Sequence, residues 1–191
     1  IFLLISKMNA IVKKMISSNE SSGVFDVVDA DDMVVRQVPR LEVHDQGLLH
    51  RAVHIFARSG NDEWILQKRS SQKDLDPLLW TSSCSGHLDA GESYLEAAVR
   101  ECNEELGVMT KTEELYEILR LSPCQETGNE FVRIYLLHKF ISPIPNKEEI
   151  LCLKTFGLEN LQRKICVQRE EFSTSFLHIF FLVKGILNEI T

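Results

Sequence analysis

Three glutamates within five consecutive positions are the residues of this chain whose spacing most directly indicates chemistry. Glu101, Glu104 and Glu105 follow a glycine-rich segment, Gly86 to Glu92, and precede Gly107. Crowded carboxylates repel one another unless a positive charge lies among them. Carboxylate oxygens are also the ligands that Mg²⁺ prefers. The spacing therefore predicts a divalent-metal site on a helix.

The residues from Ser93 to Gly107 predict the helix that carries these glutamates. Ser93, with Glu96 three positions later, has the pattern of a capping box. Gly107 is well suited to the left-handed residue that ends a helix. The helical wheel, at about 100° per residue, places the three glutamates on one arc off the apolar stripe, where Arg100 can brace Glu104. The predicted buried stripe consists of Leu95, Ala98, Val99, Cys102 and Leu106.

This segment fits the pattern G-x5-E-x7-R-E-[apolar]-x-E-E-[apolar]-G-[apolar] at every fixed position. The pattern is the Nudix box, and the chain resembles the Nudix hydrolases from about Val24 to Leu182. The resemblance implies an α/β fold, a Nudix-type α/β/α sandwich with a mixed central sheet. It also implies hydrolysis of a small nucleoside-diphosphate-type or related diphosphate substrate, with Mg²⁺ as cofactor and Mn²⁺ as an alternative.

The resemblance also implies roles for individual residues. Glu101 and Glu105 are the first-choice metal ligands, and the carbonyl of Gly86 completes their site. Glu104 is a third ligand or the base that orients the attacking water, so Glu101 and Glu104 are the candidate catalytic residues. A further carboxylate ligand from a later segment is expected, and Glu130 is the first candidate. Glu148 and Glu149 come second to it, with ordinary surface charge as their alternative explanation.

Two cations near the end of a predicted strand are candidates for binding the substrate diphosphate. Arg69 ends the strand and Lys73 follows four residues later. Their alternative explanation is a solvated surface, which is favoured for Lys68. The net charge of −7 argues against nucleic acid as the main partner. A small anionic substrate remains compatible with this local basic group.

A second resemblance, to the type I isopentenyl-diphosphate isomerases, covers the segment from His50 to His87. Those enzymes share the Nudix fold and bind a divalent metal through three histidines and acidic groups. His44, His50 and His87 fall close to those positions, after a one-residue shift for His44. They are therefore either a second metal site or ordinary polar residues near a pocket. His87 is also, with Arg69 and Lys73, a candidate substrate-binding residue.

Two departures from the isomerases favour hydrolysis. The isomerases carry a cysteine directly before the Gly-His or Ser-His pair, where this chain has Ser85, with Cys84 one residue early. Their Glu-x-Glu is here Gly128-Asn-Glu130, which retains only the second carboxylate. Without the thiol and the paired carboxylates, protonation of an alkene lacks its acid and base. Hydrolysis is the leading hypothesis, isopentenyl-diphosphate isomerisation the alternative, and a non-catalytic diphosphate-binding module the third.

The surrounding sequence predicts the elements that must position these residues. Residues 40–49, which include His44, predict a turn or one helical turn. Residues 24–29 and 33–38 predict a β-hairpin, and residues 50–57 and 63–69 predict two strands joined across 59–62. Further strands are predicted at 114–121, at 130–140 and within 148–156, and helices at 158–167 and 172–187.

Length and composition set the remaining expectations. The 191 residues fit one domain, predicted at 23–191, after a poorly ordered N-terminal extension at 1–22. The five cysteines are scattered and odd in number, which indicates reduced thiols and a cytoplasmic protein. No apolar run approaches the roughly 20 residues of a membrane span, so no membrane partner is expected. The oligomeric state is left open.

Overall fold

The computed structural model describes residues 23–190, so the predicted extension at 1–22 lies outside the described residues. In chain order the elements are β1 (Val24–Val28), β2 (Val34–Pro39), α2 (Arg40–Gln46), β3 (His50–Arg58), β4 (Trp64–Arg69), β5 (Trp80–Thr81), β6 (Cys84–His87), α3 (Tyr94–Leu106), β7 (Leu115–Leu121), β8 (Glu130–Phe140), β9 (Ile150–Phe156), α4 (Leu158–Val167) and α5 (Thr174–Ile190). Single 3₁₀ turns, η1 (Thr112–Glu114), η2 (Gln125–Thr127) and η3 (Arg169–Glu171), lie between them.

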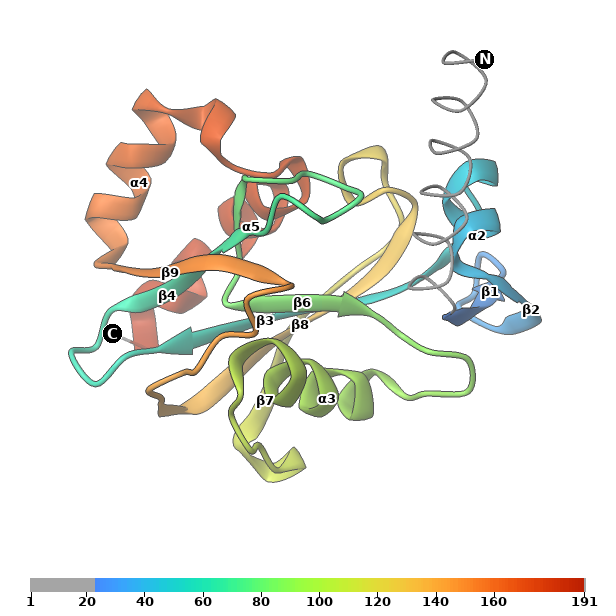
Figure 1. The fold of residues 1–191 in the computed structure, drawn as a ribbon, viewed down its shortest axis with the longest axis horizontal. Helices are drawn as coiled ribbons and strands as arrows, with labels where there is room; N and C mark the ends of the chain where they lie inside the picture. The colour runs from blue at the N-terminus through green and yellow to red at the C-terminus, as the bar shows by residue number, and fades with distance from the viewer. Residues whose placement is uncertain (1–22, 191) are drawn as a thin grey trace, which may run out of the picture.

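A seven-stranded mixed sheet forms the centre of the structure (Figure 1). Its main order is β5-β4-β3-β8-β7, with β6 paired to β3 and β9 paired to β4. The β3–β8 pair is parallel, whereas the other pairs of this sheet are antiparallel. In the parallel pair, His50 lies opposite Glu130. The predicted hairpin is also confirmed, as the separate two-stranded sheet β1-β2.

Helices cover both faces of the mixed sheet, which confirms the predicted α/β/α sandwich (Figure 1). Strand β3 is apolar on both sides, as expected of a strand covered by helices on both faces. Ala52 and Phe56 of β3 belong to the core under α4 and α5, while Val53 and Ile55 belong to the core under α3. The ends of β3 and β6 are thereby fixed between the two helical layers.

The predicted boundaries of α3 are confirmed by its caps. The Ser93 hydroxyl accepts a hydrogen bond from the Glu96 backbone N–H at 3.3 Å, and the Glu96 carboxylate accepts one from Ser93 N–H at 2.9 Å. Gly107 ends the helix with φ 63°. These contacts satisfy backbone groups that a helix terminus leaves without partners.

The predicted buried face of α3 was partly wrong. The three glutamates were predicted on one arc off the buried stripe, but Glu101 and Glu105 are themselves buried, and of the three only Glu104 is exposed. Leu95 and Val99 are just partly buried, and Tyr94 and Ala97 complete the buried face in their place. The inner face of the helix is therefore shared between the core and the carboxylates. Amphipathic periodicity cannot show this, because it assigns polar residues to solvent.

Several other boundaries differ from the expectations. Helix α5 begins at Thr174 instead of residue 172, because the Ser173 hydroxyl accepts from the Phe176 N–H and caps the helix there. Strand β6 was not predicted, since it consists of Cys84, serine, glycine and His87 and is held by its pairing with β3. The helical turn predicted within 40–49 is α2, which ends at Gly47 with φ 60°. Across residues 23–190, no helix has the length and hydrophobicity required to cross a membrane.

Candidate active site

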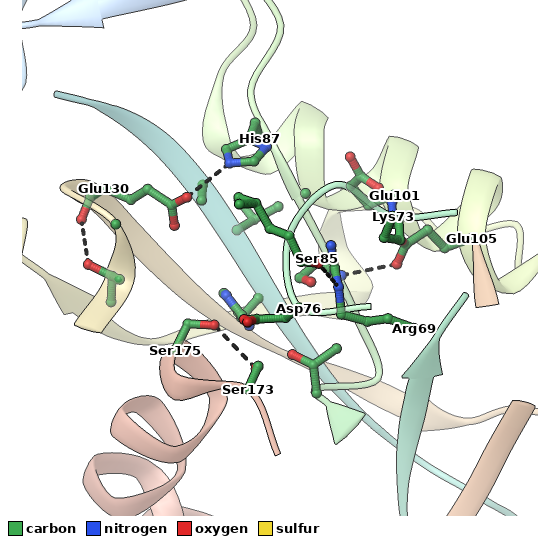
Figure 2. Close-up of a pocket in the computed structure, with 18 of the residues that line it drawn as sticks. Arg69, Lys73, Asp76, Ser85, His87, Glu101, Glu105, Glu130, Ser173 and Ser175 are labelled. Atoms are coloured by element: carbon green, nitrogen blue, oxygen red, sulfur yellow. Dashed lines mark hydrogen bonds and ion pairs between the residues drawn. The ribbon is translucent and has the colours of Figure 1, made fainter. Parts of the chain in front are cut away.

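A pocket of about 630 Å³ brings together most of the predicted site residues (Figure 2). Its walls come from α2, β3, β6, α3, η2, the start of α5, and the segment after β4. The sequence-predicted residues that line it are His44, Arg69, Lys73, Gly86, His87, Glu101, Glu104, Glu105 and Glu130. His50 is 1% exposed and packs against His87, with the ring centroids 5.1 Å apart.

Two buried carboxylates form the centre of the α3 side of the pocket. The Glu105 carboxylate accepts hydrogen bonds from Gln67 Nε2 at 2.8 Å and from the Ser85 backbone N–H at 3.2 Å. Burial, and next the charge of Glu105, raise the pKa of Glu101 to about 8. Burial also raises the pKa of Glu105, against the opposing charge of Lys73. Two buried carboxylates with raised pKa values are the environment that a divalent cation would stabilise.

Gly86 allows the Glu101 side chain to approach the backbone of β6. A Cβ atom at Gly86 would lie 1.8 Å from Glu101 Oε1 and 2.2 Å from Glu101 Cδ. No larger residue fits there without displacing the carboxylate. The structure therefore places the Gly86 backbone directly beside the Glu101 carboxylate.

Gly86→Ala is expected to reduce Mg²⁺-dependent turnover at least about tenfold, because Glu101 must leave its position. Steady-state kinetics across a Mg²⁺ titration would measure the loss and the shift in the Mg²⁺ requirement. Gly60→Ala is the matched control, since a Cβ at Gly60 meets nothing within 4 Å. Equal kinetics for the two variants would contradict the placement of Glu101 in the metal site.

Arg100 braces the carboxylates as predicted. Its guanidinium donates to Glu101 Oε1 at 2.7 Å, to Glu104 Oε2 at 3.1 Å and to both carboxylate oxygens of Glu92 at 2.9 Å. It also donates to the His87 backbone carbonyl at 2.9 Å, which ties α3 to β6. A planar, always charged fork with several N–H donors suits this task. The Glu104 side chain is 55% exposed and lines the pocket.

Lys73 and Arg69 line the pocket, and Lys73 lies beside the carboxylates of α3 (Figure 2). Lys73 Nζ is 3.8 Å from Glu105 Oε1 and forms an ion pair with Glu149. Arg69 Nε donates to the Leu75 carbonyl at 3.0 Å, and burial lowers the Arg69 pKa. Glu149, which sequence reasoning ranked low, therefore lines the pocket and balances the charge of Lys73.

The three predicted histidines meet at the other end of the pocket, from α2, β3 and β6. The ring centroids of His44, His50 and His87 lie 4.9 to 5.1 Å apart, and their ligand nitrogens lie within 4.8 Å of one another. Glu130 Oε1 is 2.9 Å from His87 Nε2 and 3.5 Å from His50 Nε2. Glu130 thus joins the histidines. Phe25 of the hairpin, which the sequence did not indicate, stacks on His50 and packs 5.1 Å from His87.

The protonation of this cluster suits metal binding. Burial, and next the neighbouring charge of His87, lower the pKa of His44 to about 4, which leaves a neutral imidazole. Burial also lowers the pKa of His87. Burial alone would raise the pKa of Glu130, but the nearby His50 and His87 hold it well below its usual value. Within residues 23–190, the Nε2 atoms of His44 and His50 are buried without a hydrogen-bond partner, while His50 Nδ1 is 2.8 Å from the Leu48 carbonyl. Neutral imidazoles beside a carboxylate are common divalent-metal ligands.

Comparison with known proteins decides the family. The family described as NUDIX domain matches residues 48–176 of the sequence. The chain belongs to the Nudix family. The predicted Nudix domain, residues 23–191, extends beyond this match at both ends.

Two similar curated proteins carry different names. The chain is 33% identical over 155 residues to an isopentenyl-diphosphate Delta-isomerase of Serratia proteamaculans, covering 80% of this chain and 87% of that protein. It is 38% identical over 130 residues to Nudix hydrolase 3 of Arabidopsis thaliana, covering 61% of this chain and 17% of that protein. Among solved structures, DR0079 from Deinococcus radiodurans aligns with a TM-score of 0.65 and 30% identity, over 76% of this chain and 90% of that one. The Nudix fold is thereby established.

The cysteine of β6 lies in the core of this Nudix protein and not in the pocket. Cys84 is fully buried, with its Sγ 3.8 Å from Cys102 Sγ in the core under α3. Burial raises the pKa of the Cys84 thiol well above its usual value. The next residue on β6, Ser85, lines the pocket instead (Figure 2). Alternation along the strand therefore directs the Cys84 thiol into the core and the Ser85 side chain toward the pocket.

The Nudix pocket also contains polar residues that sequence reasoning missed. His54 is buried, with Nδ1 2.9 Å from the Ser82 hydroxyl, and burial lowers its pKa to about 4. Such residues come from segments distant in sequence, and no local pattern marks them. The remaining polar lining includes Thr81, Gln125, Thr127, Asn146, Ser173 and Ser175.

Proposed function

We propose that this protein is a Mg²⁺-dependent Nudix hydrolase that cleaves the diphosphate linkage of a small nucleoside-diphosphate-type or related substrate. The observation that carries the proposal is the buried Glu101–Glu105 pair, which has raised pKa values and lies against Gly86 with Glu104 exposed beside it. This set of hard oxygen donors fits Mg²⁺. Both Nudix hydrolases and Nudix-type isomerases generally use divalent metals.

The proposed chemistry divides the work among the residues of the pocket. Glu101, Glu105 and the Gly86 carbonyl would hold Mg²⁺, which neutralises phosphate charge and acidifies water when bound. Glu104, exposed and hydrogen-bonded to Arg100, accepts the proton of the attacking water. The side chain of Arg100 keeps the carboxylates in place.

Arg69 and Lys73 bind the substrate phosphates in this proposal. Lys73 lies against Glu105 and Glu149, so its charge balances theirs. Because a cation on Glu105 would replace Lys73 as the neighbouring positive charge, Lys73 becomes available to a phosphate oxygen. Arg69 contributes the second cation from the same wall. Their positions support a small anionic substrate, as the acidic net charge of the chain also does.

The alternative function is isopentenyl-diphosphate Delta-isomerisation, and the histidine cluster is the observation that favours it. For either function we propose a second divalent cation held by His44, His50, His87 and Glu130. The nitrogen donors favour Mn²⁺ over Mg²⁺ at this site. His87→Gln is expected to remove one bound equivalent of Mn²⁺ in equilibrium dialysis. An unchanged stoichiometry would show that the histidines are ordinary polar residues of the pocket.

Three features favour hydrolysis over isomerisation. The Cys84 thiol is in the core, and Gly128 stands where the isomerases carry the first glutamate of their Glu-x-Glu. The pocket is also lined largely by polar groups, whereas an isoprenyl chain would gain from an apolar wall. We propose further that the protein is cytoplasmic, which is supported by cysteines that are all free.

A screen of diphosphate compounds with Mg²⁺ or Mn²⁺ tests the proposal. Products are converted to inorganic phosphate by an added phosphatase and measured, and isopentenyl diphosphate is incubated in parallel in deuterated water. We expect hydrolysis of at least one nucleoside-diphosphate-type compound and no deuterium in the isopentenyl substrate. Deuterium incorporation without any hydrolysis would establish the isomerase instead. No turnover of any compound in either assay would favour a binding module.

A further inference from the structure

Cys124, Glu126 and His178 form a third group of metal-ligating side chains, separate from the glutamates of α3 and from the histidine cluster. Their ligand atoms all lie within 4.8 Å of one another. Cys124 and Glu126 belong to the turn around η2, between β7 and β8, and His178 lies on α5, which packs against that turn. The proposed hydrolysis uses none of these three residues.

The turn that presents Cys124 and Glu126 is held by its own hydrogen bonds. Asn129 N–H donates to the Cys124 carbonyl at 3.0 Å, and Gly128 N–H donates to the Gln125 carbonyl at 3.2 Å. The buried Thr127 hydroxyl lies 3.4 Å from Cys124 Sγ and 3.3 Å from the Glu130 carbonyl. Cys124 is therefore fixed by contacts that do not involve His178.

The position of His178 is fixed independently by the core. The stacked rings of Phe176 and Phe180 lie 5.6 Å apart on the buried face of α5 and anchor that helix under the sheet. His178, between them in sequence, is half-buried and faces the turn, with Nε2 3.8 Å from Cys124 Sγ. Two rigid elements therefore bring a thiol and an imidazole together across 54 residues of sequence.

The donor set points to zinc rather than magnesium. A thiol sulfur, an imidazole nitrogen and a carboxylate oxygen suit a borderline cation such as Zn²⁺. With Zn–S and Zn–N bonds of about 2.3 and 2.0 Å, the sulfur and nitrogen ligands of a tetrahedral zinc ion lie about 3.5 Å apart. The 3.8 Å between Cys124 Sγ and His178 Nε2 is close to this value. Glu126 is exposed and can adjust to the third position.

We propose that Cys124, Glu126 and His178 bind a zinc ion and leave one coordination position open. Binding releases the thiol proton of Cys124 to solvent, so that the sulfur coordinates as thiolate. The ion would fasten the β7–β8 turn to α5. Because Glu126 and Thr127 also line the pocket, and Glu130 follows them, the ion would fix one rim of the substrate pocket.

Cobalt substitution tests the site, because Co²⁺ bound to a thiolate gives a sulfur-to-metal charge-transfer band. The full chain is titrated with Co²⁺ in excess Mg²⁺ and then with Zn²⁺. We expect the band to appear, to persist in excess Mg²⁺ and to disappear as Zn²⁺ displaces Co²⁺. The histidine cluster contains no thiol, so its occupancy does not produce this signal.

Variants assign the band to its ligands. Cys124→Ser should abolish it, and His178→Gln should weaken cobalt binding at least about tenfold, as expected for loss of one ligand of three. Cys166→Ser, which removes an exposed cysteine on α4, is the matched control and should keep the band. Circular dichroism of the metal-free variants checks that each is folded. No band in the folded wild type, or a band that persists in folded Cys124→Ser, would overturn the proposal.

Discussion

Glu105→Gln is expected to lower Mg²⁺-dependent turnover by about 10³-fold while raising the stability of the metal-free protein. The loss follows because a metal ligand contributes several kcal/mol of transition-state charge stabilisation, and each 1.4 kcal/mol or so is a factor of ten. The gain follows because Glu105 is a buried carboxylate, and burial raises its pKa. A neutral amide of the same shape removes the free-energy cost of burying an ionised carboxylate. Gln67 and Ser85 N–H retain an oxygen acceptor.

Turnover and thermal unfolding of the same preparations separate this outcome from misfolding. Glu159→Gln, an exposed glutamate on α4, is the matched control for the chemical change and should alter neither measurement. Added Mg²⁺ should raise the melting temperature of the wild type and leave that of Glu105→Gln nearly unchanged. Near-normal turnover in Glu105→Gln would remove this residue from the metal site.

The second large effect is a pH dependence of metal-free stability that originates at Glu101. Its pKa is raised to about 8 in the folded protein from an ordinary value of 4.5, so the folded state favours the protonated form. Protonated Glu101 therefore stabilises the folded protein fully below about pH 4.5, and this stabilisation is lost as the pH rises through about 8. Each unit of this pKa difference corresponds to about 1.4 kcal/mol of folding free energy. Relaxation around Glu101 and Glu105 reduces the effect, so we expect the free energy of unfolding to change by about 2 kcal/mol.

The difference between wild type and Glu101→Gln isolates this contribution from the histidines. With a chelator present, the two proteins should have similar free energies of unfolding at pH 5. The wild type should be about 2 kcal/mol less stable than Glu101→Gln at pH 8. Urea unfolding at several pH values measures the free energy of unfolding of the wild type and of Glu101→Gln. Because bound Mg²⁺ favours the ionised carboxylate, Mg²⁺ should reverse the difference at pH 8. A constant difference across the range would show that Glu101 ionises normally in the folded state.

The local part of the site was predictable because its information lies within one helix. The capping pair Ser93 and Glu96, the left-handed Gly107 and the Arg100 brace all depend on contacts at short sequence separation, and the structure has each of them. The resemblance to known families added the histidines. It did so because their spacing is typical of a site, although His44, His50 and His87 come from three elements.

The remaining features depend on long-range packing that no local pattern encodes. The burial of Glu101 and Glu105 was not predicted, since it follows from how α3 lies against β6. Phe25 covers the histidines from a separate hairpin, and Lys73 meets Glu149 across 76 residues. The direction of the Cys84 thiol required β6 to be recognised as a strand. Each of these depends on which elements become neighbours.

The parallel pairing of β3 with β8 has a consequence for how the protein folds. His50 faces Glu130 across this ladder, 80 positions along the chain, with β4, β6, α3 and β7 between them. Closing so long a loop is slow, and folds dominated by such contacts take milliseconds to seconds. A shift of one position in the pairing would turn the Glu130 side chain to the opposite face of the sheet. A cation held by the histidine cluster and Glu130 would therefore bind late in folding. It would stabilise only those molecules in which β3 and β8 had paired in the correct register.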